Sequence, residues 1–131
     1  MKQFFIFFLA ITFFSCNSDD DAPSNQFELL LGDWLRTGLT IDGDNQLDPD
    51  SCDFILIFED SFATIETYSS DDCDQLTSDS GVYSVQNSNL SISLEGDIYG
   101  GEIITLTQTT LILESVNNGN GAVQRTTFTK Q

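Results

Sequence analysis

The sequence predicts an all-β domain of antiparallel strands, and three observations lead to this prediction. From Asp33 onward, short runs rich in Thr, Ile, Leu, Val and Phe alternate with clusters of Gly, Asn and Asp, which is typical of strands and turns. No long stretch shows the period of a helix, so the crossovers that parallel strands need are missing. In Leu90–Leu94, apolar residues line one face of the predicted strand and serines the other.

Eight segments qualify as strands, and residues that favour turns separate them, including the pair Gly100 and Gly101. A short helix is expected before the strands at Gln26–Leu31, capped by Ser24 or Asn25 and ended by Gly32. Eight antiparallel strands either close into a barrel or form a two-sheet sandwich. The predicted strands are Trp34–Ile41, Phe54–Phe58, Phe62–Tyr68, Gly81–Val85, Leu90–Leu94, Glu102–Thr107, Leu111–Val116 and Val123–Thr129.

Three motifs in order give a resemblance to a known family. Leu30–Trp34 contains Gly-Asp-Trp, Gly81–Val85 is followed by Asn89–Ile92, and the chain ends on Arg125–Lys130. These segments resemble the Gly-x-Trp opening, the middle strands and the final strand of lipocalin-like bacterial lipoproteins, over residues 27–131. The resemblance implies a small eight-stranded antiparallel up-and-down barrel with a short N-terminal helix and a shallow cup at one end.

The resemblance also gives Trp34 a role. In lipocalins the Trp of this motif closes one end of the barrel, and an arginine from the last strand packs over it. Arg125 is the candidate partner here, and such a cation–π contact stabilises by about 0.5–2 kcal/mol. The alternative is that Trp34 contacts a ligand.

The N-terminal segment has the pattern of a signal peptide. Lys2 precedes an apolar run from Phe4 to Phe14, which is about half the length that a bilayer core requires. The run ends at Ser15-Cys16, which resembles the lipobox of bacterial lipoproteins, where the Cys takes a lipid and becomes the first residue of the mature chain. Phe13 and Phe14 depart from the usual pattern of that motif. The alternative is an ordinary secreted protein with an unmodified Cys16.

An acidic segment follows Cys16. Asp19–Asp21 resembles the export signal that sends some lipoproteins of one Gram-negative group to the outer face of the outer membrane, and the alternative is a solvated linker. The expected organisation is a signal peptide at 1–15, a flexible acidic tether at 16–24 and a lipocalin-like domain at 25–131. We therefore expect a lipid-anchored outer-membrane protein that faces the cell exterior.

Composition excludes several functions. The formal net charge is −17, so neither nucleic acid nor an anionic membrane surface would be bound through charge. The chain has no histidine, which excludes Ser-His-Asp and Cys-His catalysis within it. Carboxylate pairs occur by chance in so acidic a chain, and no motif distinguishes one. We expect a monomer that is not an enzyme.

Cys52 and Cys73 flank a predicted hairpin at its open end, so a disulfide is expected in the oxidising exterior. The alternative, a thiolate nucleophile, is disfavoured because Asp53, Asp72 and Asp74 flank the two cysteines and would raise the thiol pKa. A zinc site would need more ligands than two cysteines provide.

The loop at 42–53 has oxygen ligands at alternate positions, a pattern that calcium sites use. Leu47 stands where an EF-hand needs Gly, and the twelfth position is not Glu, so a solvated loop is the preferred interpretation and no cofactor is expected. The weak calcium candidates are Asp42, Asp44, Asp48, Asp50 and Asp53.

Three function classes remain open at this point. The first is a binding module for a small apolar or amphipathic ligand, in which small residues leave space inside the barrel. The second is a filled structural barrel that binds another envelope protein, and the third is an acidic calcium-binding surface module. The family resemblance favours the first class, for which the space-forming candidates are Ala63, Thr64, Gly81 and Ser84.

Overall fold

The computed structural model describes residues 22–131, so the predicted signal peptide, the lipid site at Cys16 and the acidic run after it lie outside the described residues. Helix α1, Ala22–Leu30, begins earlier than expected and takes in the last three residues of the predicted tether. The predicted caps Ser24 and Asn25 are therefore wrong, because both lie inside the helix. No helix in this part of the chain is long and apolar enough to cross a membrane.

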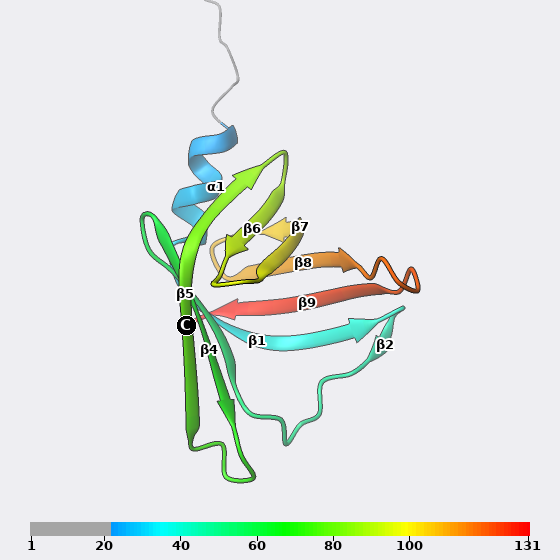
Figure 1. Ribbon diagram of the computed structural model, residues 1–131. Helices are drawn as coiled ribbons and strands as arrows, with labels where there is room; N and C mark the ends of the chain where they lie inside the picture. Colours follow the sequence, from blue (N-terminus) through cyan, green and yellow to red (C-terminus); the bar gives the residue numbers. More distant parts are fainter. Residues whose placement is uncertain (1–21) are drawn as a thin grey trace, which may run out of the picture.

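The strands follow one another around a closed antiparallel barrel (Figure 1). Each of the long strands pairs with its neighbours in sequence, and β1 pairs with β9 to close the barrel. This confirms the predicted eight-stranded up-and-down barrel, to which the short β2 adds a hairpin on the end of β1. The strands are β1 Gly32–Ile41, β2 Asp44–Asn45, β3 Phe54–Phe58, β4 Phe62–Ser69, β5 Gln75–Gln86, β6 Asn89–Ser93, β7 Ile98–Leu106, β8 Thr110–Val116 and β9 Val123–Lys130.

Two strands, β5 and β7, begin several residues earlier than the sequence predicted. The first half of β5 is polar and exposed because the β4–β5 hairpin extends beyond the barrel, as Figure 1 shows. In β7, Gly100 and Gly101 form part of the strand and not the expected turn. A Cβ at Gly100 would lie 2.1 Å from the carbonyl oxygen of Leu90, so this position needs glycine for close approach of the strands.

The core fills the end of the barrel on which α1 lies. Inward positions alternate with outward ones along each strand, as the period of two requires. All strands of the closed barrel lie within residues 22–131, and the buried apolar residues of this segment form one cluster. They are Leu30, Trp34, Leu56, Phe58, Ala63, Ile65, Leu90, Ile92, Ile103, Leu111, Leu113 and Phe128.

Candidate functional site

The closed end of the barrel is organised around Trp34. Its side chain is fully buried, and its indole Nε1 donates a hydrogen bond of 2.6 Å to the carbonyl oxygen of Leu30 at the end of α1. Lys130 pairs with Trp34 across β1 and β9, and its Nζ lies 5.0 Å from the centre of the indole ring. The same Nζ donates to the carbonyl oxygen of Leu29 at 3.1 Å. Trp34 therefore joins the helix to the barrel.

The predicted contact between Arg125 and Trp34 is wrong, because Lys130 occupies that place. In β9, Thr126, Phe128 and Lys130 face the interior, so Arg125 lies on the outer face, an odd number of residues from all three. There its Nε pairs with the carboxylate of Glu114, and its side chain is 58% exposed. The alternation around buried Phe128 was a sequence signal that could have identified Lys130.

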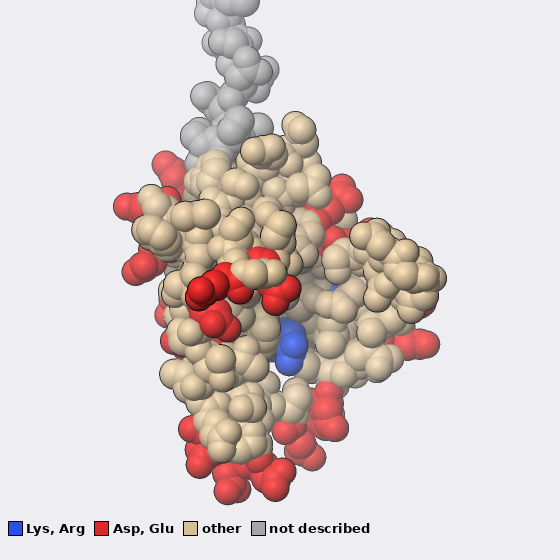
Figure 2. All heavy atoms as spheres, in the orientation of Figure 1, with Lys and Arg blue, Asp and Glu red and all other residues tan. Residues whose placement is uncertain are grey.

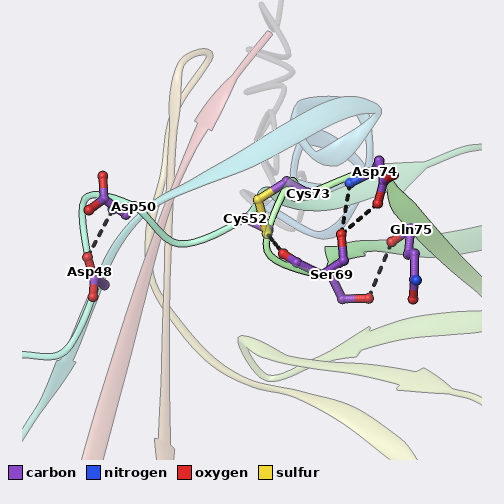
Figure 3. Close-up of a disulfide and its surroundings, with 8 residues drawn as sticks. Asp48, Asp50, Cys52, Ser69, Cys73, Asp74 and Gln75 are labelled. Carbon is purple, nitrogen blue, oxygen red and sulfur yellow. Dashed lines mark hydrogen bonds between the residues drawn. A yellow bond between two sulfur atoms is a disulfide. The ribbon is translucent and has the colours of Figure 1, made fainter.

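At the opposite end, the β2–β3 loop and the tip of the β4–β5 hairpin are joined by the Cys52–Cys73 disulfide (Figure 3). The two Cα atoms lie 5.3 Å apart, which confirms the predicted pairing. The amide of Tyr68 also donates to the carbonyl oxygen of Asp53 at 3.0 Å, so the edge of the mouth is held by the disulfide and by backbone pairing.

Two acidic residues of this end accept hydrogen bonds from backbone amides of the surrounding loops. Asp42 Oδ1 accepts a hydrogen bond from the amide of Val123, and Asp48 Oδ1 accepts one from the amide of Asp50. Figure 3 shows Asp48 and Asp50 together on their own turn, away from Asp74 beside the disulfide. Within residues 22–131, no three acidic, Cys or His side chains gather in a way that could hold a metal ion. The calcium candidates of the 42–53 loop are thus placed, but not assembled into a site.

The interior of the open end contains a cation on an aromatic base. Arg36 follows Trp34 on the same face of β1, and its Cα pairs with that of buried Phe128. The Arg36 Cζ lies 5.0 Å from the centre of the Phe54 ring, and the Phe54 and Tyr99 ring centres are 5.6 Å apart. Burial raises the pKa of Tyr99 to about 12, while the positive charge of Arg36 acts in the opposite direction. Tyr99 therefore stays neutral and its hydroxyl can donate at physiological pH.

Arg36 has no carboxylate partner within residues 22–131. Among the described residues, Arg125–Glu114 is the single ion pair, although the chain is rich in acids. Figure 2 shows basic side-chain atoms at the base of a hollow, over the position of β1, with acidic side chains along its edges. Arg36 is half-buried and lies on the inward face of β1 with Trp34, so its charge lies in the mouth, without an acidic partner among the described residues.

Between Arg36 and the rim, β1 contributes apolar side chains to the wall of the mouth and the neighbouring β9 contributes polar ones. The β1–β9 pairing shifts by one residue between Arg36 and Gly38, so the inward positions of β1 change from even to odd numbers. Leu39 and Ile41 therefore face inward, and their Cα partners are Thr126 and Gln124. Leu39 is half-buried and Ile41 is 36% exposed. The interior therefore changes from a packed apolar base to a partly open, amphipathic mouth.

The residues that were expected to leave space do not do so. Ala63 and Gly81 face inward, but Ala63 is fully buried, and a Cβ at Gly81 would lie 1.9 Å from the carbonyl oxygen of Ser93. Their small size lets neighbouring backbones approach. Thr64 and Ser84 lie on the outer face, in register with Ser80 and Ser91.

The residues of the mouth were missed at the level of sequence. Arg36 stands two positions from Trp34, which is a strand spacing that places both on one face, and the described chain has few cations. That signal could have identified Arg36. Tyr99 lies next to the glycine pair that was expected to be a turn, so its inward direction could not be predicted.

Known proteins support this description. Residues 30–113 match the family described as the lipocalin-like domain. Among solved structures, a lipocalin-like protein from Bacteroides uniformis superimposes with a TM-score of 0.63 at 18% identity, covering 79% of this chain and 99% of that one. An uncharacterized protein from Bacteroides eggerthii gives 0.61 at 14% identity, covering 78% and 99%. Lobster apocrustacyanin A1 gives 0.52 at 16% identity, covering 82% and 64%. At these low sequence identities, the superpositions show that the proteins share a fold and nothing more. Comparison with curated proteins gives no match.

Proposed function

Because this chain belongs to the lipocalin-like domain family, we propose that the mouth of its barrel binds a small amphipathic ligand. The observation that carries the proposal is the set of inward-facing apolar side chains that the protein leaves partly exposed. Leu39, Phe54 and Tyr99 are only half-buried, and Ile41 is exposed at the rim. Small barrels either fill their interior or hold one small ligand, and here Phe54 and Tyr99 pack against the core while Leu39 and Ile41 retain exposure toward the rim.

The size of the mouth limits the ligand. The close-packed base, from Trp34 to Phe128, leaves the open half of the barrel as the region in which inward side chains retain exposure. A ligand would lie against Phe54 and Tyr99 at the base and leave through the rim. Apolar contact would stabilise the complex by about 25 cal/mol per Å² of buried area. Because the buried core occupies the closed end, only a small ligand can bury its surface in the open half.

The test uses residues 22–131, which contain the complete barrel, and N-phenyl-1-naphthylamine, a neutral dye whose fluorescence rises in apolar surroundings. The dye should bind the unmodified domain, and Leu39→Trp should abolish binding because the indole fills the mouth. Val82→Trp is the matched control, since Val82 is exposed on the outer face. Equal binding to both variants, at unchanged melting temperatures, would contradict the proposal and favour a filled barrel that binds an envelope protein.

We also propose that the domain is displayed on the cell exterior by a lipid on Cys16. The support is the sequence pattern of an apolar run, Cys16 and an acidic segment, with the helix α1 beginning shortly afterwards. A palmitate analogue fed to the expressing cells should label the unmodified chain and not Cys16→Ala. Protease added to intact cells should remove the labelled protein, and protection from protease would place it on the inner face.

A further inference from the structure

We propose that the ligand of the mouth carries a single negative charge and that Arg36 binds this charge. This inference rests on the proposed function, because it names the chemistry of the ligand for the same site. Three observations support it: the position of Arg36 over Phe54, the lack of an acidic partner for Arg36 within residues 22–131, and the acidic side chains at the rim of the mouth.

The contact of Arg36 with Phe54 leaves its hydrogen-bond donors available. The guanidinium lies 5.0 Å from the ring centre, so the ring interacts with the cation through its π face. A guanidinium has five N–H donors directed along its edges, and these suit a carboxylate in bidentate geometry. A ligand that covers the half-buried Arg36 would take its charge out of water, which is costly unless the ligand brings a charge to pair with it. A bound anion would provide the pairing that the described residues do not.

The acidic side chains of the described residues make no ion pair with Arg36. Glu114 pairs with Arg125 on the outer face, and Asp42 accepts from the amide of Val123 at the rim. No carboxylate among the described residues lies within 4.0 Å of the Arg36 nitrogens. In a chain of net charge −17, a cation without such a partner inside the mouth is best explained by a ligand that supplies the anion.

The acidic edges of the hollow in Figure 2 restrict the ligand to one negative charge. Any second negative group would extend past Arg36 toward the rim, where the loop at 42–53 and the hairpin tip carry aspartates. Like charges there would repel it, and the field of the whole domain would add to the repulsion. A monoanionic amphiphile meets attraction at the base without this repulsion.

The wall above Arg36 accepts the apolar part of such a ligand. From Gly38 to Ile41, β1 rises by about 3.3 Å per residue over three steps, which gives about 10 Å of wall that carries inward Leu39 and Ile41. The anionic group would thus lie at the base, beside Arg36 and the Tyr99 hydroxyl, and a short apolar chain would run toward the rim. A ten-carbon chain is a suitable probe.

The experiment titrates residues 22–131 in a calorimeter with four probes of equal chain length: decanoate, 1-decanol, decylammonium and decanedioate. Decanoate should bind at least tenfold more tightly than each of the others. Arg36→Gln should weaken decanoate binding by about ten- to a hundredfold, as expected for loss of a charge-assisted hydrogen bond. The same variant should leave the affinity for decanol unchanged within a factor of three, and Arg36→Lys should restore part of the decanoate affinity.

Arg125→Gln is the matched control, because it removes one cation from the outer face and should not change decanoate binding. Melting temperatures of all variants verify that they fold. If decanol binds as tightly as decanoate and Arg36→Gln changes neither, the inference fails while the proposed function stands. Preferred binding of decylammonium would likewise overturn it, because the acidic rim would then select the ligand. If no probe binds, both proposals fail.

Discussion

At each end of the barrel a cation lies 5.0 Å from the centre of an aromatic ring, and the two ends differ in what else the cation contacts. At the closed end, Lys130 lies over Trp34 and also donates to the carbonyl oxygen of Leu29, so the helix, the tryptophan and the lysine form one structural unit. At the open end, Arg36 lies over Phe54 and has no acidic partner among the described residues. Lys130 thus has a hydrogen-bond acceptor within the protein, whereas Arg36 has no acidic partner among the described residues, and we infer that a ligand provides one.

The largest expected effect comes from breaking the closed end. Trp34→Ala removes a fully buried indole together with its hydrogen bond to Leu30, and should lower the free energy of unfolding by about 3–5 kcal/mol. Arg36→Gln, at the open end, removes only the contact with the Phe54 ring and should lower it by about 0.5–1 kcal/mol. Urea denaturation of the two variants measures the difference. Equal losses would mean that Arg36 supports the fold and would remove the distinction between the ends.

Reduction of the disulfide should have the next largest effect, and it should act on the mouth. Cys52 and Cys73 close a loop with a sequence separation of 21, and its loss should destabilise the domain by about 3 kcal/mol in the chain-entropy model. Cys52→Ser/Cys73→Ser should therefore exchange its amide hydrogens faster in the β4–β5 tip and the β2–β3 loop than around Trp34. Uniformly faster exchange throughout the barrel would show that the disulfide supports the whole fold and not the mouth in particular.

High pH should weaken the open end through Tyr99. Its pKa is raised to about 12 in the folded protein, whereas an unfolded tyrosine ionises near 10, so the folded state holds its proton longer. The resulting stabilisation is present below pH 10 and is lost as the pH rises through 12, by up to about 2 kcal/mol. Melting temperatures between pH 9 and 12 should therefore fall more steeply for the unmodified domain than for Tyr99→Phe. Parallel curves would show that Tyr99 is accessible to water in the folded protein.

The closed end was more predictable from sequence than the open end, and the reason is physical. Hydrophobic alternation and the Gly-x-Trp motif predict Trp34 and the strand order, because burial imposes a period of two on the sequence. Burial imposes no such period on the exposed first half of β5 or on the residues of the mouth. The orientation of Tyr99 depends on strand pairing, and that of Leu39 and Ile41 on a local irregularity near Gly38, so these orientations required the structure.

The partner of Trp34 shows how a single register error changes a role. Arg125 and Lys130 both lie on the last strand, β9, and a resemblance to lipocalins selected the arginine. Because side chains alternate across a strand, an odd separation of five residues places the two on opposite faces. Only the one in register with Trp34 could pack on it.

The smallest expected effect again separates the ends, this time through a tyrosine of the closed end. The Tyr83 hydroxyl is buried without a hydrogen-bond partner among the described residues, and the Tyr83 ring packs against Phe27 in α1 and Phe58 in β3. Burial, and then the negative charge of Asp60, raise the pKa of this side chain, so the hydroxyl is neutral and serves no partner. Because an unpaired buried hydroxyl destabilises the folded state, Tyr83→Phe should raise the free energy of unfolding by up to about 1 kcal/mol. The measurement is a denaturation curve beside that of Tyr99→Phe at neutral pH, and a clear loss of stability in Tyr83→Phe would mean that its hydroxyl is bonded through water and belongs to the structural unit around Trp34.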